Sequence, residues 1–227
     1  MKTIIIVIMF LMMTTLSYSN DIYVTQSGNA LDLDITQDGE NNTVGNSTTA
    51  SASAGATTIL NIDQIGDSNV ITYQIAGATY TGVINLVGNS NNVDLNCDST
   101  GGNSSCGTAN AVINFTGSSN DIDLDIGQTS SANTADVDIV GQSGSDSNVV
   151  AATVDGNSAV LTITVNGDTN NYLIDIDGNG DSVGHTLIHS HTGGIADVDI
   201  IQSGTNDNMI TLTTSGDNAD IDISQTD

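Results

Sequence analysis

The chain has 227 residues and a formal net charge of −26, and its one basic side chain is Lys2. Because no Lys or Arg follows position 2, the chain cannot neutralise phosphate. This excludes nucleic-acid binding, Lys-based phosphate loops and Schiff-base chemistry, and it disfavours binding to anionic membrane surfaces.

Residues 1–19 have the composition of a secretory signal peptide. Lys2 precedes an apolar run over residues 3–13, and Ser17 and Ser19 form a small-x-small cleavage motif. The run is too short to span a bilayer comfortably. We therefore expect cleavage after Ser19 and a secreted, extracellular or cell-surface domain over 20–227, with no membrane insertion.

Strand-like alternation dominates residues 20–227. Ile, Val and Leu alternate with polar residues, a period of two that is typical of β-strands. Good helix formers are scarce, since Lys and Arg are absent after position 2. The pattern predicts an ordered all-β protein rather than a disordered acidic chain.

Glycines recur at a step of 11 residues, as from Gly66 to Gly77 to Gly88. The unit around them is strand–turn–strand, most clearly in Leu60-x-Ile62-x-Gln64-x-Gly66-x-x-Asn69. The Gly-x-x-Asn segment predicts a tight turn, because Gly and Asn tolerate positive φ. The predicted turn glycines are Gly28, Gly39, Gly66, Gly88, Gly117, Gly144, Gly167 and Gly204.

Two such arms make a coil of about 22 residues, so residues 20–227 predict a β-solenoid of roughly nine coils. Each arm is too small to bury its apolar face alone, whereas stacked arms bury one continuous ladder. Loop insertions are expected near 45–58 and 96–108, where the period breaks. The alternative is a β-sandwich with coincidental glycines.

Gln and Asn recur on the face that carries the apolar residues. A buried amide needs partners, and in a stack each amide can bond to the amides above and below it. The predicted amide ladder comprises Gln26, Gln37, Asn42, Gln64, Asn69, Asn91, Asn120, Gln142, Asn148, Asn170, Gln202, Asn208 and Gln225.

The segments Gln37-x-Gly39-x-x-Asn42 and Gln64-x-Gly66-x-x-Asn69 resemble the centre of the curlin repeat, the unit of curli fibre subunits. Ile75 departs from that pattern, since it stands where the repeat has a second Gln. The resemblance implies a secreted subunit of amyloid-like fibres for adhesion and biofilm matrix. It also implies self-association, a nucleator and an outer-membrane secretion pore as partners.

Both ends of 20–227 stop within the repeat pattern, at Ile22 and near Gln225. Unprotected strand edges are templates for another copy, and head-to-tail contacts that do not close give filaments. The alternative is a monomeric solenoid that acts as a surface adhesin or binding module. Flat Thr arrays for ice binding are not expected, because Thr162/Thr164 and Thr211/Thr213 are isolated pairs.

Outward positions are often Asp, as in Asp121, Asp123 and Asp125. This acidic face predicts a solvated surface that controls solubility and salt dependence, with loosely bound divalent cations such as Ca²⁺ as the alternative. Glycosidases use paired acids in distinct environments, whereas these Asp residues recur evenly along the chain. We therefore expect no enzyme activity and assign no catalytic residue, cofactor or metal site.

Two smaller groups remain. Cys97 and Cys106 flank a polar loop and predict one disulfide in a secreted chain, with a metal site as the weaker alternative. His185, His189 and His191 lie within seven residues. We expect a chance cluster of exposed histidines, although His189 and His191 share a strand face that suits Zn²⁺ or Cu²⁺.

Overall fold

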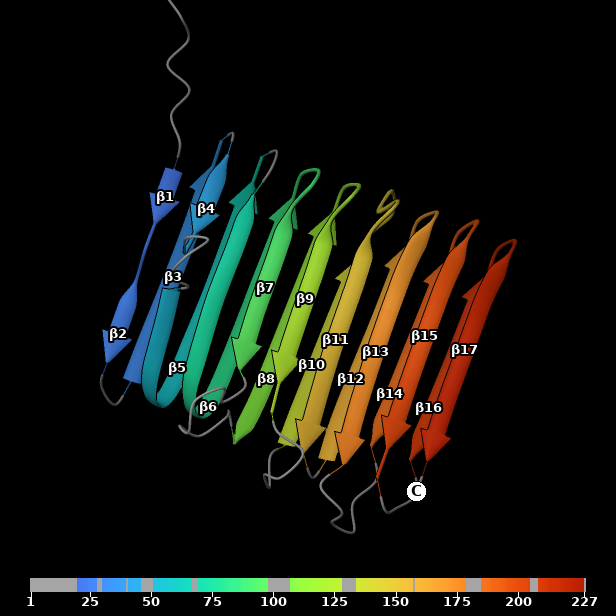
Figure 1. Ribbon diagram of the computed structural model, residues 1–227. Coiled ribbons are helices and arrows are strands. Elements are labelled where there is room, and N and C mark those ends of the chain that lie inside the picture. Colours follow the sequence, from blue (N-terminus) through green and yellow to red (C-terminus); the bar gives the residue numbers. More distant parts are fainter. Residues whose placement is uncertain are drawn as a thin grey trace, which may run out of the picture.

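The computed structural model describes residues 20–27, 30–39, 41–45, 51–66, 69–97, 107–127, 134–156, 158–178, 185–204 and 208–226. All regular structure in these ranges is β-strand, and every strand pairing is parallel. The strands stand side by side in a row from the N-terminal to the C-terminal end (Figure 1). The prediction of an all-β solenoid is confirmed.

The chain passes alternately through two layers of stacked strands. Layer A contains β3 (Ala30–Asp38), residues 57–65 of β5 (Ser51–Ile65), residues 79–87 of β6 (Val70–Val87), β8 (Thr108–Thr116), β10 (Thr134–Gly141), β12 (Ser158–Asn166), β14 (Thr186–Thr192) and β16 (Met209–Ser215). Layer B contains β1 (Asn20–Ile22), β2 (Thr25–Ser27), β4 (Asn42–Val44), the first parts of β5 and β6, β7 (Asn92–Cys97), β9 (Asp121–Ile126), β11 (Val149–Gly156), β13 (Asn170–Gly178), β15 (Ala196–Ser203) and β17 (Ala219–Thr226).

The length of a coil varies along the stack. Leu60 lies beside Gly82, a step of 22 residues, but Gly82 lies beside Ala111, a step of 29. The prediction of a uniform 22-residue coil is therefore wrong. The long step contains the predicted insertion near 96–108, of which residues 98–106 lie outside the described part of the chain.

The stretch 45–58 is not a loop throughout, because β5 begins at Ser51. Its first residues pair with residues 73–77 of β6, so they continue layer B. The Ser, Ala and Thr residues of this strand lack the alternation by which the other strands were predicted. Residues 46–50 lie outside the described ranges.

The core lies between the two layers. Strand side chains alternate between buried and exposed, as in β12 and β15. The buried positions form columns of aliphatic side chains along the stack, and fully burying each such side chain contributes about 1.5–3 kcal/mol. One column of layer B runs through Ile22, Val44, Ile71, Val93, Ile122, Val150, Tyr172, Val198 and Ile221.

The turn from layer A to layer B is tight and is the same in most coils. Gly88 has φ +154°, and a Cβ atom there would overlap the carbonyl oxygen of Gly66 in the preceding coil. Glycine therefore allows the turns to stack as closely as the strands do. The third turn residue is left-handed, with φ near +60° at Asn41, Ser90 and Ser119.

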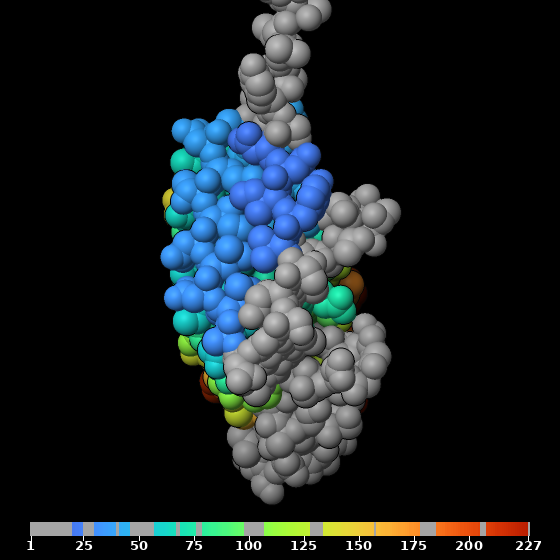
Figure 2. Space-filling view, turned by 90° about the vertical axis from the view of Figure 1, so that its left-hand side faces the viewer, coloured from blue at the N-terminus to red at the C-terminus, as the bar shows by residue number. Residues whose placement is uncertain are grey.

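Both ends of the described stack expose a strand layer. All residues of β17 are exposed, including the apolar Ile221 and Ile223 that continue the core columns. In the described part of the chain, β16 pairs with β14 alone and β17 with β15 alone. The first strands form the surface at the N-terminal end, in blue in Figure 2.

Candidate assembly surfaces

A column of buried Asn side chains follows the A-to-B turns. The Oδ1 atom of Asn120 accepts hydrogen bonds from the backbone N–H and from Nδ2 of Asn91, both at 3.0 Å. Asn170 accepts the same pair from Asn148, at 2.9 and 3.0 Å. The structure thus places four of the predicted amides, Asn91, Asn120, Asn148 and Asn170, in one hydrogen-bonded column.

The same side chains close the turns. Nδ2 of Asn120 donates to the carbonyl oxygen of Gly117 at 2.9 Å, and Asn170 does so to Gly167 at 3.0 Å. Each Asn therefore satisfies backbone groups of its own turn and of the preceding coil. This differs from its predicted role as a residue of positive φ, which the preceding residue adopts instead.

The Asn column is interrupted towards both ends. Asn42 accepts from Asn20, a partner that sequence reasoning missed, at 2.7 Å. The amide of Asn69 has no hydrogen-bond partner among the described residues, although its backbone N–H donates to Asn91. Ala196 and Ala219 occupy this position in the last two coils.

Gln residues form separate, short columns near the ends of the stack. In layer A, Nε2 of Gln64 donates to Oε1 of Gln37 at 2.6 Å. In layer B, Gln225 donates to Gln202 at 3.4 Å. The side chain of Gln26 lies outside the described part, but its backbone is in β2 of layer B.

Two predicted amides are not in these columns. Gln142 is exposed, because the turn over 141–148 is longer than the others, and buried Ser145 donates a hydrogen bond to the carbonyl oxygen of Phe115 there. Asn208 is half-buried and precedes β16, where its Oδ1 accepts from the backbone N–H of His185. It lies at the end of the solenoid opposite the Asn column.

The predicted turn glycines fall into two groups. Gly39, Gly66, Gly88, Gly117, Gly144 and Gly167 belong to A-to-B turns. Gly204 follows β15 and belongs to the opposite, variable turn, and Gly28 lies outside the described residues. Sequence reasoning missed Gly193 and Gly216, whose turns stack on Gly167 and Gly193 respectively.

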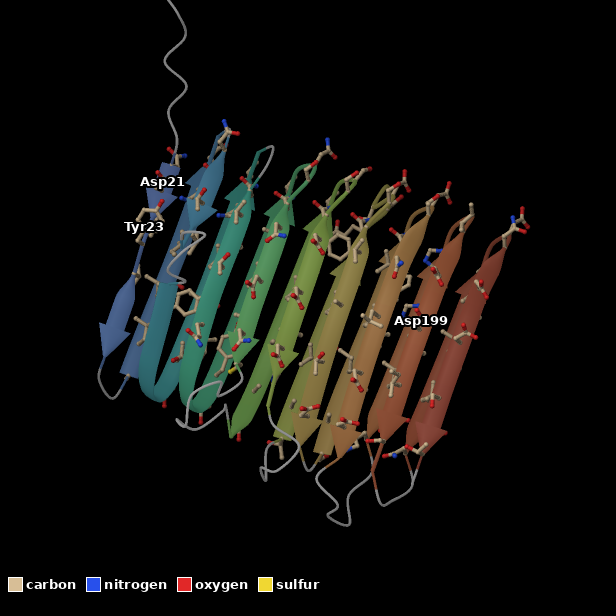
Figure 3. The ribbon with its side chains drawn as sticks, viewed as in Figure 1. Asp21, Tyr23 and Asp199 are labelled. Carbon is tan, nitrogen blue, oxygen red and sulfur yellow. The ribbon has the colours of Figure 1, made fainter. Side chains whose placement is uncertain are left out.

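The outward side chains are largely polar (Figure 3). Many carboxylates accept a hydrogen bond from an Asn of the next coil, such as Asp34 from Asn61 at 2.8 Å and Asp63 from Asn85 at 2.6 Å. Asn114 in turn donates to Asn85 at 2.8 Å. A chain without basic side chains after Lys2 thus uses amides as the partners of its outer carboxylates.

Some carboxylates are stacked directly on one another. Asp94 lies beside Asp123, and Asp199 beside Asp222. Burial, followed by the nearby charges of Asp94 and Asp121, raises the pKa of Asp123. The predicted even Asp ladder is therefore wrong, since Asp alternates with Asn, Thr and aliphatic residues in most columns.

We expect Asn85→Asp to lower the free energy of unfolding by about 0.5–1 kcal/mol at low salt, because the new carboxylate would lie beside Asp63. Asn114 can still donate to it, so the loss comes from like-charge repulsion. Urea unfolding at low salt and near 1 M salt measures this, since screening there is nearly complete. Thr81→Asp is the control, because its neighbours Ile59 and Asn110 are uncharged. Equal, salt-independent losses in both variants would contradict the pairing.

The three histidines are buried, not exposed as predicted. His185, His189 and His191 are at most 1% exposed, because the register places β14 with His189 between Ile163 and Leu212 in the core. In the described residues, no group of three or more His, Cys, Asp or Glu side chains is placed to hold a metal ion.

Cys97 is buried at the end of β7 and is disulfide-bonded. Cys106, the other cysteine of the chain, lies outside the described residues.

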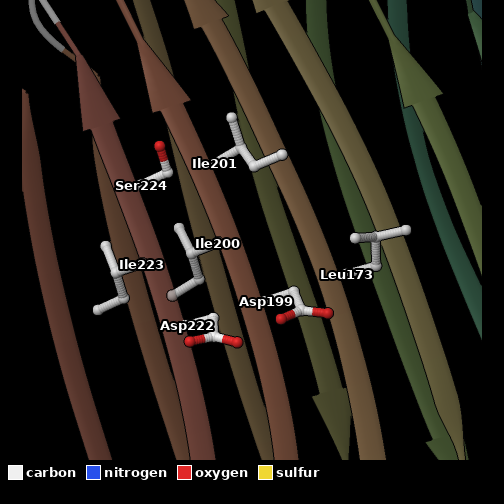
Figure 4. A pocket seen from close by; sticks show the side chains of 7 residues that line it. All are labelled: Leu173, Asp199, Ile200, Ile201, Asp222, Ile223 and Ser224. Atoms are coloured by element: carbon white, nitrogen blue, oxygen red, sulfur yellow. The ribbon is translucent and has the colours of Figure 1, made fainter.

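A shallow groove lies at the C-terminal end of the outer face of layer B (Figure 4). Leu173, Asp199 and Asp222 lie side by side on successive coils, and Ile201 lies beside Ser224. The lining residues are Leu173, Asp199, Ile200, Ile201, Asp222, Ile223 and Ser224. The groove thus joins exposed aliphatic side chains of the outer face to the open edge of β17.

Comparison with protein-family models, with curated proteins and with solved structures finds no match. Among the residues that the structure describes, no helix has the length and apolar character needed to cross a membrane.

Proposed function

We propose that this chain is a secreted structural subunit whose solenoids stack end to end into extracellular curli-like fibres for adhesion and biofilm matrix. The observation that carries the proposal is the match between the two exposed ends. The first coil of layer B has Ile22-x-Val24-x-Gln26, and the last has Ile221-x-Ile223-x-Gln225. Both segments lie in the same layer.

If β17 of one copy pairs with β1 and β2 of the next in this register, each core column continues across the junction. Ile221 and Ile223, which are 37% and 49% exposed, would lie beside Ile22 and Val24. Gln225 would lie beside Gln26 and extend the column of Gln202. In layer A, Ile210 and Leu212 would lie beside Leu33 and Ile35. Burying these aliphatic side chains is the driving force, and amide pairing supplies the register.

The charges at this junction are few. Asp220 would lie beside Asp21 of the next copy, while Asp222 would lie beside Tyr23. Figure 3 labels Asp21 and Tyr23 at the N-terminal end. One stacked pair of like charges costs about 0.2–1 kcal/mol. Salt or a divalent cation should therefore accelerate assembly without being required for it.

The signal-like residues 1–19, which lie outside the described residues, support secretion. The proposal includes delivery to the cell surface through an outer-membrane pore and growth from a nucleating partner, because the curlin-like repeats carry that expectation. It assigns no enzyme activity.

We expect Ile223→Asp to slow fibre growth by at least about 100-fold, because the junction would bury an unpaired carboxylate at a cost of several kcal/mol. The fold should survive, since Ile223 is half exposed in the single chain. Growth is measured with an amyloid dye and electron microscopy of the purified chain from residue 20. Circular dichroism checks the fold.

Leu173→Asp is the matched control. Leu173 is 50% exposed, as Ile223 is, but it lies on the outer face away from the junction. This variant should grow at the wild-type rate. Equal growth of both variants would overturn the junction, and a wild-type chain that stays monomeric at high salt would overturn fibre formation.

The second candidate is a monomeric binding module, and the groove beside Asp199 and Asp222 is the observation that favours it. Exposed aliphatic side chains with two carboxylates suit a ligand that is apolar with a cationic group. A wild-type chain that remains monomeric would make this groove the place to search for a ligand.

A further inference from the structure

The interior of the solenoid changes character at β14. In the coils before it, inward positions of layer A are mostly aliphatic, as at Ile163 and Val165 of β12. In β14 the same columns carry His189 and His191, and His185 lies just before the strand. All three imidazoles are buried, and Tyr172 of β13 faces them across the core with its ring centre 4.4 Å from that of His189.

The ring nitrogens of this cluster are poorly prepared for a second proton. Neither nitrogen of His189 has a hydrogen-bond partner, and Nε2 of His185 and of His191 also lacks one. Nδ1 of His185 accepts the backbone N–H of Ala159 at 3.0 Å, so a proton there would face another donor. Nδ1 of His191 lies 2.9 Å from the hydroxyl of Tyr172.

We propose that His185, His189 and His191 make the C-terminal strands β14–β17 open on acidification while the earlier coils stay folded. An imidazolium carries two N–H donors and a charge, and a buried charge without partners is strongly unfavourable. The cluster is stable only when all three rings are neutral. This inference does not depend on fibre assembly.

The groups that face the cluster do not offset the burial. Asp177 of β13 lies near His185, and Asp168 of the turn before β13 lies near His191, and each favours the charged form of its neighbour. Burial outweighs both, so the pKa of His185 and of His191 is lowered. Tyr172 is neutral, because burial raises its pKa. The remaining inward side chains of β12, β16 and β15 carry no charge and are Leu161, Ile163, Val165, Ile210, Leu212, Thr214, Val198, Ile200 and Gln202.

His189 has no acidic neighbour that counters its burial. Burial, and then the adjacent His191, lowers its pKa from 6.5 to about 4. Because the folded pKa lies below the unfolded one, the unfolded state binds more protons between these values. The stabilisation is fully present above pH 6.5 and is lost as the pH falls towards 4. For His189 alone, this raises the opening equilibrium by up to about 300-fold.

The position of the cluster confines the opening to one end. In a solenoid each coil contacts its neighbours only, so terminal coils can detach without unfolding the rest. In the described residues, β16 pairs with β14 alone, so it loses its support when β14 separates from β12. The strands β15 and β17 lie in the same coils and open with it.

The test is hydrogen exchange by mass spectrometry on the dilute, monomeric chain at pH values from 7.5 to 5, corrected for intrinsic exchange. We expect the protection of β14–β17 to fall at least tenfold relative to β7–β9, which contain no histidine. Ordinary Asp carboxylates stay charged in this range. However, burial and then the nearby Asp177 raise the pKa of Asp175, so a histidine variant must decide.

His189→Leu is that variant, because Ile163 and Leu212 flank the position in its column. It should retain most of its protection in β14–β17 at pH 5. If Leu does not pack there, low protection at pH 7.5 will reveal it, and His191→Val, beside Val165, replaces it. Protection that is independent of pH, that falls equally in β7–β9, or that falls in the packed variant as in the wild type would overturn the proposal.

Discussion

Replacing Gly88 by Ala is expected to lower the free energy of unfolding by about 3–5 kcal/mol, which for a stack of this kind is a large share of the total. Two costs combine. The backbone at Gly88 has φ +154°, which residues with a side chain rarely adopt. The new Cβ would also overlap the carbonyl oxygen of Gly66, and that oxygen cannot retreat without breaking the strand register.

Gly144→Ala separates these two costs. Gly144 has φ +86°, but a Cβ there would meet nothing within 4 Å. It should lose only about 1 kcal/mol or slightly more, the cost of the backbone conformation. Urea unfolding followed by far-ultraviolet circular dichroism measures both variants. Losses of equal size would show that the close stacking of turns contributes nothing.

Local patterns were sufficient to predict the strands and their inward residues. The alternation through Leu60, Ile62 and Gln64 identifies a strand with one buried face, and these three side chains are buried. The Gly-x-x-Asn motif likewise predicted the turn at Gly117 and the buried amide of Asn120. In each case the determining interactions lie within a few residues of one another or repeat at every coil.

The register between coils could not be predicted, because it depends on loops whose lengths vary. The steps of 22 to 29 residues decide that Asn85 lies beside Asp63 and that His189 lies between Ile163 and Leu212. A constant 22-residue period places neither pair correctly. The burial of the histidines and the pairing of Asn with Asp were therefore missed.

A further group of errors arises where one member of a motif is replaced. Gly193 and Gly216 occupy the same turn position as Gly167, but Ala196 and Ala219 stand where the motif has Asn. Conversely, Gly204 and Asn208 imitate the motif at the other end of the solenoid, where the turn differs from coil to coil. Sequence alone does not distinguish the two ends, because both recur at a similar step.

We expect Asn170→Ala to cost about 2–4 kcal/mol of the free energy of unfolding. Oδ1 of Asn170 accepts from the backbone N–H and from Nδ2 of Asn148, and its own Nδ2 donates to Gly167. Removing the side chain leaves the buried groups of Asn148 and Gly167 without these partners, at about 1–3 kcal/mol for each unsatisfied group. The cavity term should be small, since Ala196 occupies the next position in the same column.

Asn171→Ala is the control, because it makes the same chemical change one residue away. Asn171 is exposed, and its backbone N–H bond to Asn148 survives the substitution. Its loss should stay within about 0.5 kcal/mol, as for an ordinary surface position. Equal losses for the two variants in urea unfolding would mean that the Asn column does not stabilise the fold.

The double variant Asn148→Ala with Asn170→Ala then decides whether the column acts as a unit. If each amide stabilises its neighbour, removing the second costs less than removing the first, since its partner is already gone. The double variant should therefore lose about 1 kcal/mol less than the sum of the single losses. Additive losses would mean that each Asn acts within its own turn, through bonds such as that of Asn170 to Gly167, and that stacking adds nothing.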